Sequence, residues 1–181
     1  MNICILTIFD MKQRKPNRLK EYNYSNNGWY FVTMCTKNRT PYFGKINNGK
    51  MVLNEIGKIV DEYWNKIESL HKNIDLDYYV IMPNHIHGII IIENVGDANF
   101  ASPTNKTYDR TKMELSKIIQ QFKRAVTIKI RNNKHDLNFQ WQHSFYDRII
   151  RNERELYNIR NYIRENPFKW ALKKDIENLD V

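Results

Sequence analysis

Apolar and polar positions alternate along this chain in two distinct periods. Where apolar residues recur at every second position, or run on with β-branched and aromatic side chains, the pattern is typical of strands. Where they recur three and four positions apart, it predicts amphipathic helices. The strand patterns cover 28–36, 75–82, 86–93 and part of 139–151, an Asn48-Gly49 signal predicts a hairpin within 42–53, and the helical patterns cover about 54–72, 112–131 and 153–165.

These elements follow one another as strand, hairpin, helix, strand, strand, helix, strand and helix. This order predicts an α+β fold, an antiparallel sheet with helices packed on one face and an arrangement close to a split βαβ unit. Pro167 disfavours the α conformation at Asn166, so we expect the last helix to end there or one residue sooner.

One domain accounts for most of the chain, since 181 residues suffice for a single core and no internal repeat is present. We expect this domain at 21–172, with a flexible N-terminal extension at 1–20 and a C-terminal tail at 173–181. The turn-rich polar stretch 94–110 predicts a mobile loop.

Charge and composition narrow the choice of partner. Lys and Arg number 29 against 20 Asp and Glu, and the resulting charge of +9 favours a polyanion such as nucleic acid. Tyr 11, Phe 8 and Trp 4 offer stacking surfaces for unpaired bases. Two cysteines, Cys4 and Cys35, argue against a disulfide scaffold and predict a cytoplasmic location. The sequence gives no sign of a membrane partner.

The strongest chemical signal lies between two of the apolar strands. A Pro83-Asn84 break precedes His85 and His87, which open the second strand. Successive strand side chains point to opposite faces, so the two histidines share a face. About 7 Å apart along the backbone, their imidazoles can close on one divalent ion. Polar groups in a Val/Ile run must find partners, so we look for a third ligand.

The last helix supplies that ligand and a nucleophile. At about 100° per residue, Tyr162 and Asn166 lie side by side at the edge of the buried stripe and face the sheet together. A divalent ion held by His85, His87 and the Asn166 oxygen would polarise a phosphate, and attack by the Tyr162 phenol would give a phosphotyrosine and a free 3′-hydroxyl. Tyr146 is a rival nucleophile, but it has no companion ligand at helical spacing.

Candidate DNA contacts are assigned by residue type. Cations suit backbone phosphates, and aromatic rings suit unpaired bases. The phosphate candidates are Lys117, Lys123 and Arg124 on the second helix together with Arg148 and Arg151, and the stacking candidates are Trp141 and Tyr146.

Several motifs together resemble the REP-associated tyrosine transposases, within the single-tyrosine HUH transposases. The resemblance covers about residues 20–172, and it rests on Pro83-Asn84-His85-Ile86-His87-Gly88, Trp141-Gln142, Asp147-Arg148-Ile149-Ile150-Arg151-Asn152-Glu153 and Asn161-Tyr162-Ile163-Arg164-Glu165-Asn166-Pro167-Phe168-Lys169-Trp170.

This resemblance implies a ferredoxin-like fold of the HUH endonuclease type that cleaves single-stranded DNA beside a hairpin. It also implies a 5′-phosphotyrosine intermediate, Mg²⁺ or Mn²⁺ as the metal, and a monomer or a homodimer. By motif match, His85 and His87 are metal ligands, Tyr162 is the nucleophile and Asn166 is the third ligand, where other single-tyrosine enzymes often have Gln.

Two other classes of function remain open on the sequence. One is a domain that binds hairpin DNA or RNA without cutting it. The other is a metal-dependent nuclease in which activated water attacks, and a covalent protein–DNA product separates the tyrosine mechanism from both.

Overall fold

The computed structural model describes residues 27–93, 114–133 and 136–179. The expected extension 1–20 and the expected loop 94–110 lie outside these ranges. The described elements follow the predicted order, with one short 3₁₀ helix added. They are β1 (Gly28–Cys35), η1 (Lys37–Arg39), β2 (Gly44–Asn47), β3 (Lys50–Leu53), α1 (Glu55–Leu70), β4 (Ile74–Met82), β5 (His85–Ile92), α2 (Glu114–Asn132), β6 (Tyr146–Ile150) and α3 (Glu153–Leu179).

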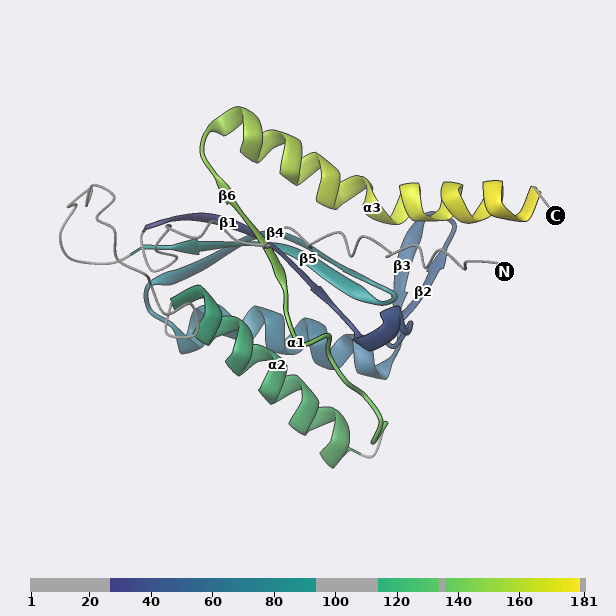
Figure 1. Cartoon of the computed structure of the whole chain (residues 1–181), viewed down its shortest axis with the longest axis horizontal. Coiled ribbons are helices and arrows are strands. Elements are labelled where there is room, and N and C mark those ends of the chain that lie inside the picture. The colour runs from purple at the N-terminus through teal and green to yellow at the C-terminus, as the bar shows by residue number, and fades with distance from the viewer. Residues whose placement is uncertain (1–26, 94–113, 134–135, 180–181) are drawn as a thin grey trace, which may run out of the picture.

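The main sheet is antiparallel, with strand order β4-β5-β1-β6, and β2 and β3 form a separate hairpin. Two helices, α1 and α2, cover one face of this sheet, as predicted (Figure 1). The third helix, α3, crosses the opposite face (Figure 1). The uninterrupted run Ile89–Ile92 explains this difference, because it supplies apolar side chains to both faces, and each face then needs a cover.

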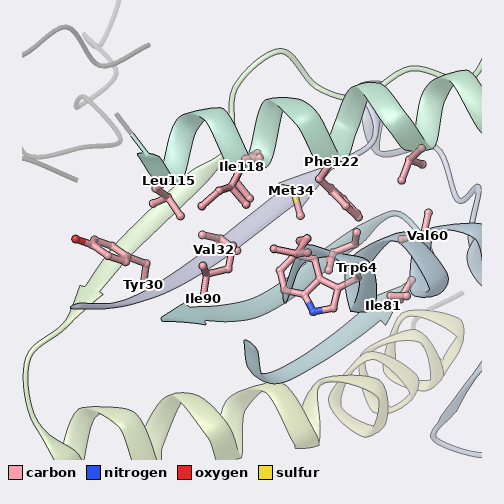
Figure 2. Close-up of a cluster of buried hydrophobic side chains, with 14 of the residues drawn as sticks. Tyr30, Val32, Met34, Val60, Trp64, Ile81, Ile90, Leu115, Ile118 and Phe122 are labelled. Carbon is pink, nitrogen blue, oxygen red and sulfur yellow. The ribbon is translucent and has the colours of Figure 1, made fainter. Parts of the chain in front are cut away.

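Trp64 of α1 occupies the centre of the larger core (Figure 2). Its ring is fully buried and meets Phe122 of α2 edge to face, with ring centroids 5.6 Å apart. On the sheet side it lies against Gly88 of β5, where an added Cβ would come within 2.4 Å of Trp64 Cζ2. The absence of a side chain at Gly88 therefore lets α1 pack closely behind the His85–His87 segment.

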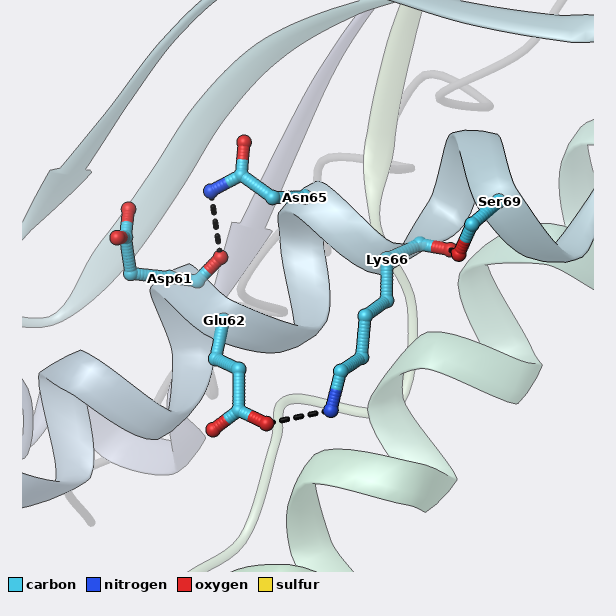
Figure 3. A network of polar contacts seen from close by, with 5 residues as sticks. All are labelled: Asp61, Glu62, Asn65, Lys66 and Ser69. Atoms are coloured by element: carbon cyan, nitrogen blue, oxygen red, sulfur yellow. Dashed lines mark hydrogen bonds and ion pairs between the residues drawn. The ribbon is translucent and has the colours of Figure 1, made fainter.

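The exposed face of α1 is polar, as its amphipathic pattern predicts. Asn65 Nδ2 donates to the Asp61 carbonyl at 2.9 Å, Lys66 pairs with Glu62, and Ser69 Oγ donates to the Lys66 carbonyl at 2.9 Å (Figure 3). These are contacts within one helix turn on a solvated surface, and they contribute little to the position of the helix. No helix in the described parts of the chain has the length and apolar character needed to cross a membrane.

The predicted end of α3 at Asn166 is wrong. The helix continues through Pro167 to Leu179 and changes direction near its middle (Figure 1). Proline inside a helix removes one backbone hydrogen bond and clashes with the preceding turn, which kinks the helix without having to end it. Here the second half is held by tertiary contacts, with Phe168 packed over Gly49 of the hairpin and Trp170 beside His85.

Candidate active site

His85 and His87 lie on the sheet face that α3 covers. In the strand register His85 is opposite Cys35 and His87 is opposite Thr33, both on β1. The alternate residue, Ile86, points into the core beneath α1 and α2. Both histidines are buried, with 5% and 6% of their surface exposed, so the shared face predicted from the sequence is confirmed.

The two imidazoles converge on one point. His85 Nε2 and His87 Nε2 lie 3.0 Å apart. His85 Nδ1 lies 2.6 Å from Asn84 Oδ1, which can only accept, so this ring carries its proton on Nδ1 and leaves a lone pair on Nε2. The Asn84 amide is oriented in turn by donating Nδ2 to the Arg39 carbonyl at 2.9 Å.

His87 is held by a partner that adapts to its tautomer. Its Nδ1 lies 2.8 Å from Thr33 Oγ1, a hydroxyl that can donate or accept. When a cation takes the Nε2 lone pair, the proton of His87 can sit on Nδ1 and be donated to Thr33. Such outer contacts orient metal-binding histidines in proteins generally.

Burial keeps both rings neutral. Desolvation, assisted by the nearby Arg39 charge, lowers the pKa of His85 to about 4. Desolvation together with the charges of His85 and Arg39 lowers the pKa of His87 to about 3. At pH 7 both side chains therefore offer neutral imidazole nitrogens, the form that binds metal ions.

This pair fits a divalent ion. Two ligands at a right angle, each about 2.1 Å from an ion, are separated by about 3.0 Å. The observed separation of the two Nε2 atoms is 3.0 Å. No group of three His, Cys, Asp or Glu side chains suited to a metal occurs among the described residues.

Tyr162 of α3 lies directly beside this pair. Its hydroxyl is 3.2 Å from His87 Nε2, and the two rings are 5.1 Å apart. Phe31 of β1 supports both rings, stacking on His87 at 5.4 Å and meeting Tyr162 edge to face at 6.0 Å. With 42% of its surface exposed, Tyr162 remains accessible to a substrate.

Asn166 follows Tyr162 by one helical turn and is buried, with 9% of its surface exposed. One turn further, the Trp170 ring lies 5.8 Å from the His85 ring. Tyr162, Asn166 and Trp170 thus form one stripe along α3, whose two ends contact His87 and His85. Asn166 lies between these contacts, and its role as third ligand stays a prediction.

Two ion pairs fix the position of α3 over the sheet. Arg160 donates through Nε and Nη2 to Asp77 Oδ2 at 2.9 and 2.6 Å. Asp77 lies where the β4 register shifts between Leu76 and Tyr79. At the start of the helix, Arg148 of β6 pairs with Glu155 at 2.6 Å. These contacts add to the burial of apolar residues of α3 against the sheet.

The basic helix α2, with Lys117, Lys123 and Arg124, lies on the other side of the sheet from the histidines (Figure 1). Lys123 Nζ is directed inward and donates to the carbonyls of Gln142 and Ser144 at 2.9 and 3.2 Å. Burial lowers its pKa to about 8. The structure therefore gives Lys123 an internal contact that the sequence pattern did not indicate.

The other candidate DNA contacts are divided between core and surface. Trp141 packs against Phe43, Phe139 and Phe122. These contacts fit a residue that packs against the core better than one that stacks on a base. Arg148 is on the histidine face but is paired with Glu155, while the Arg151 side chain is exposed. Tyr146, the rival nucleophile, is opposite Thr33 on the same face, so it is one strand further from His87 than Thr33 is.

Sequence reasoning missed the residues around the histidines. Thr33 and Phe31 act through the register between β5 and β1, which the sequence does not show, whereas Asn84 contacts His85 as its neighbour in the chain. Trp170 carried a usable signal, since it follows Asn166 at the same spacing as Asn166 follows Tyr162. Because we expected the helix to end before Trp170, we did not place this residue on the same helical face as Tyr162 and Asn166.

Comparison with known proteins places the chain in context. No protein-family model matches the sequence. An uncharacterized protein of Haemophilus influenzae is 40% identical over 162 residues, which cover 87% of this chain and 89% of that protein. A solved REP-associated tyrosine transposase bound to a REP hairpin superposes with a TM-score of 0.50 at 21% identity, over 84% of this chain and 73% of that one. The chain thus belongs to one family with the Haemophilus influenzae protein, and its fold is that of the REP-associated tyrosine transposase.

Proposed function

We propose that this chain is a transposase of the single-tyrosine HUH type, a metal-dependent endonuclease and transesterase that cuts single-stranded DNA beside a hairpin. The proposal rests on one observation. The Tyr162 hydroxyl lies 3.2 Å from His87 Nε2, which itself lies 3.0 Å from His85 Nε2. A nucleophile adjoining two convergent neutral imidazoles is the arrangement required for metal-assisted phosphoryl transfer.

His85, His87 and Asn166 are the residues that would hold Mg²⁺ or Mn²⁺, which when bound neutralises charge on the scissile phosphate. The surrounding protein orients the ligands, since Asn84 and Thr33 each hold the second nitrogen of one ring. Because the pKa values of both histidines are lowered, neither imidazole is protonated on both nitrogens at pH 7. The ion therefore does not have to displace a proton from a charged ring when it binds.

Tyr162 performs the chemical step. Its phenolic oxygen bonds to phosphorus as the bond from phosphorus to the 3′-oxygen breaks, leaving a 5′-phosphotyrosine and a 3′-hydroxyl. The phenol loses its proton to solvent, and the departing 3′-oxygen gains one. The bond energy is retained in the phosphotyrosine, so the reverse attack by a 3′-hydroxyl rejoins a strand without a nucleotide cofactor.

Hairpin DNA is the proposed partner. The solved protein that shares this fold was captured on a REP hairpin. The charge of +9 on the present chain favours a polyanion independently of that likeness.

A covalent-adduct assay tests the proposal. The purified full chain is incubated with hairpin-bearing single-stranded DNA from its own genome, with Mn²⁺ or with EDTA. We expect a protein-linked DNA band that requires Mn²⁺, is lost in Tyr162→Phe and persists in Tyr157→Phe, a matched change at an exposed tyrosine of the same helix.

Other results would assign the protein to another class. Cleavage without a protein-linked product would identify a nuclease that uses water. Tight hairpin binding with no cleavage in Mn²⁺ or Mg²⁺ would identify a binding domain.

A further inference from the structure

A cleft opens at one end of the histidine pair, between the β2–β3 hairpin and the part of α3 that follows Pro167. The hairpin and this part of the helix lie next to each other (Figure 1). Its volume is about 770 Å³, which falls within the range of small-ligand sites. Its walls come from segments far apart in the sequence. The residues that matter here are Arg39, Lys45, Asn48, Asn84, Phe168 and Trp170.

The cleft is joined to the active site through two shared residues. Asn84 lines the cleft and also accepts the hydrogen bond from His85 Nδ1. Trp170 lines the cleft and also lies 5.8 Å from the His85 ring. Tyr162, by contrast, contacts His87. The cleft and the nucleophile are therefore at opposite ends of the histidine pair.

The lining of the cleft has the chemistry of a nucleotide site. Phe168 is 58% exposed and rests on Gly49 at the tip of the hairpin, so its ring offers a face to an unpaired base. Asn48 is exposed at the tip of the hairpin and presents an amide that can pair with a base edge. Arg39 and Lys45 are exposed and make no ion pair with another described residue, which leaves them available to phosphate oxygens.

We propose that this cleft holds the nucleotide on the 5′ side of the scissile phosphate, the one whose 3′-oxygen departs. In phosphoryl transfer the attacking and leaving oxygens lie roughly in line on opposite sides of phosphorus. With Tyr162 attacking from the His87 end, the leaving oxygen points toward the His85 end, where the cleft begins. This assignment rests on the proposed function, since it takes Tyr162 as the nucleophile.

Abasic substrates test the assignment without altering the protein. Once the cleavage position is mapped, the base is removed either from the nucleotide on the 5′ side of the cut or from the one on its 3′ side. We expect the 5′ change to reduce cleavage about 5- to 150-fold, the range for loss of one stacked base, and the 3′ change to have much less effect. An equal loss, or a larger loss from the 3′ change, would overturn the assignment.

A variant links the effect to the cleft. Phe168→Ala should reduce cleavage of the intact substrate and abolish the difference between the two abasic substrates. Tyr157→Ala removes a similarly exposed ring from the same helix outside the cleft and should retain that difference. Retention of the full difference in Phe168→Ala, with an unchanged circular dichroism spectrum, would contradict the proposal.

Photocrosslinking separates this proposal from the proposed function. A short oligodeoxythymidylate carrying 5-iododeoxyuridine is irradiated with the Tyr162→Phe chain, and the linked peptides are identified by mass spectrometry. We expect the label on the peptides that contain Phe168 or Trp170. Crosslinks there without any covalent adduct in the wild type would support the cleft and refute the nucleophile, whereas crosslinks confined to other surfaces would refute the cleft.

Discussion

Replacement of Gly88 by alanine should destabilise the protein by overpacking directly behind the active site. The new Cβ would lie 2.4 Å from Cζ2 and 2.7 Å from Cη2 of Trp64, far inside van der Waals contact. The indole ring is fully buried and meets Phe122 edge to face, so it has little room to move away. Overpacking of this kind costs about 1–3 kcal/mol. For a chain of this size, that corresponds to a fall in Tm of roughly 2–12 °C.

Thermal unfolding followed by circular dichroism measures this effect, and Gly28→Ala provides the matched control. At Gly28 the nearest atom to an added Cβ is Tyr30 Oη at 3.5 Å, an ordinary contact. We expect its Tm to stay near that of the wild type. The steric cause is tested by repeating Gly88→Ala in a Trp64→Phe background, where the smaller ring removes the clash.

A double-mutant cycle then isolates the contact. The cost of Gly88→Ala should be clearly smaller in the Trp64→Phe background than in the wild type. A cost of Gly88→Ala no larger than that of Gly28→Ala, or the same cost in both backgrounds, would contradict a clash between residue 88 and Trp64.

Three further predictions follow from the contacts of the site and its support. His85→Ala should abolish Mn²⁺ binding, measured by isothermal titration calorimetry, and cleavage, while hairpin binding persists; loss of both would indicate a folding role. Asp77→Asn removes the partner of Arg160 and should lower the cleavage rate severalfold by loosening α3, whereas Asp75→Asn, at an exposed position of the same strand, should not. The folded chain releases the Lys123 proton near pH 8 and the unfolded chain near 10.5, so the unfolded state binds more protons between these values. The urea unfolding free energy of the wild type should therefore rise over this interval relative to Lys123→Met, and parallel pH profiles would contradict the lowered pKa of Lys123.

The strands, the hairpin and the bodies of the helices followed from local pattern. Asn54 caps α1 as its position suggested, accepting from the Gly57 amide at 2.9 Å. The turn at Asn48-Gly49 takes positive φ at both residues, which is the conformation that this pair favours. Such features depend on residues close together in sequence, and sequence periodicity reports them well.

The second half of α3 could not be predicted in the same way. Pro167 is a genuine local signal for a helix end, but contacts of Phe168 with Gly49 and of Trp170 with His85 outweigh it. These partners are far away in the sequence. Tertiary contacts likewise decided that α3 covers the second face of the sheet.

The sequence predicted the directions of single side chains in the site better than the contacts between them. Strand alternation placed His85 and His87 on one face, and helical spacing directed Tyr162 toward the sheet, as the structure confirms. The hydrogen bond between Thr33 and His87 depends on the register between β1 and β5, which the sequence does not show, whereas His85 donates to its neighbour Asn84. The number and spacing of basic residues did not show that Lys123 donates to backbone carbonyls of the protein instead of facing solvent.

The most direct test of the account is to locate the DNA attachment on the protein. The wild-type chain is allowed to react with a cleavable hairpin substrate in Mn²⁺, the adduct is digested with protease and nuclease, and the modified peptide is sequenced by mass spectrometry. We expect a nucleotide joined through its 5′-phosphate to Tyr162. A nucleotide on Tyr146, or cleaved DNA with free 5′-phosphates and no modified peptide, would contradict it.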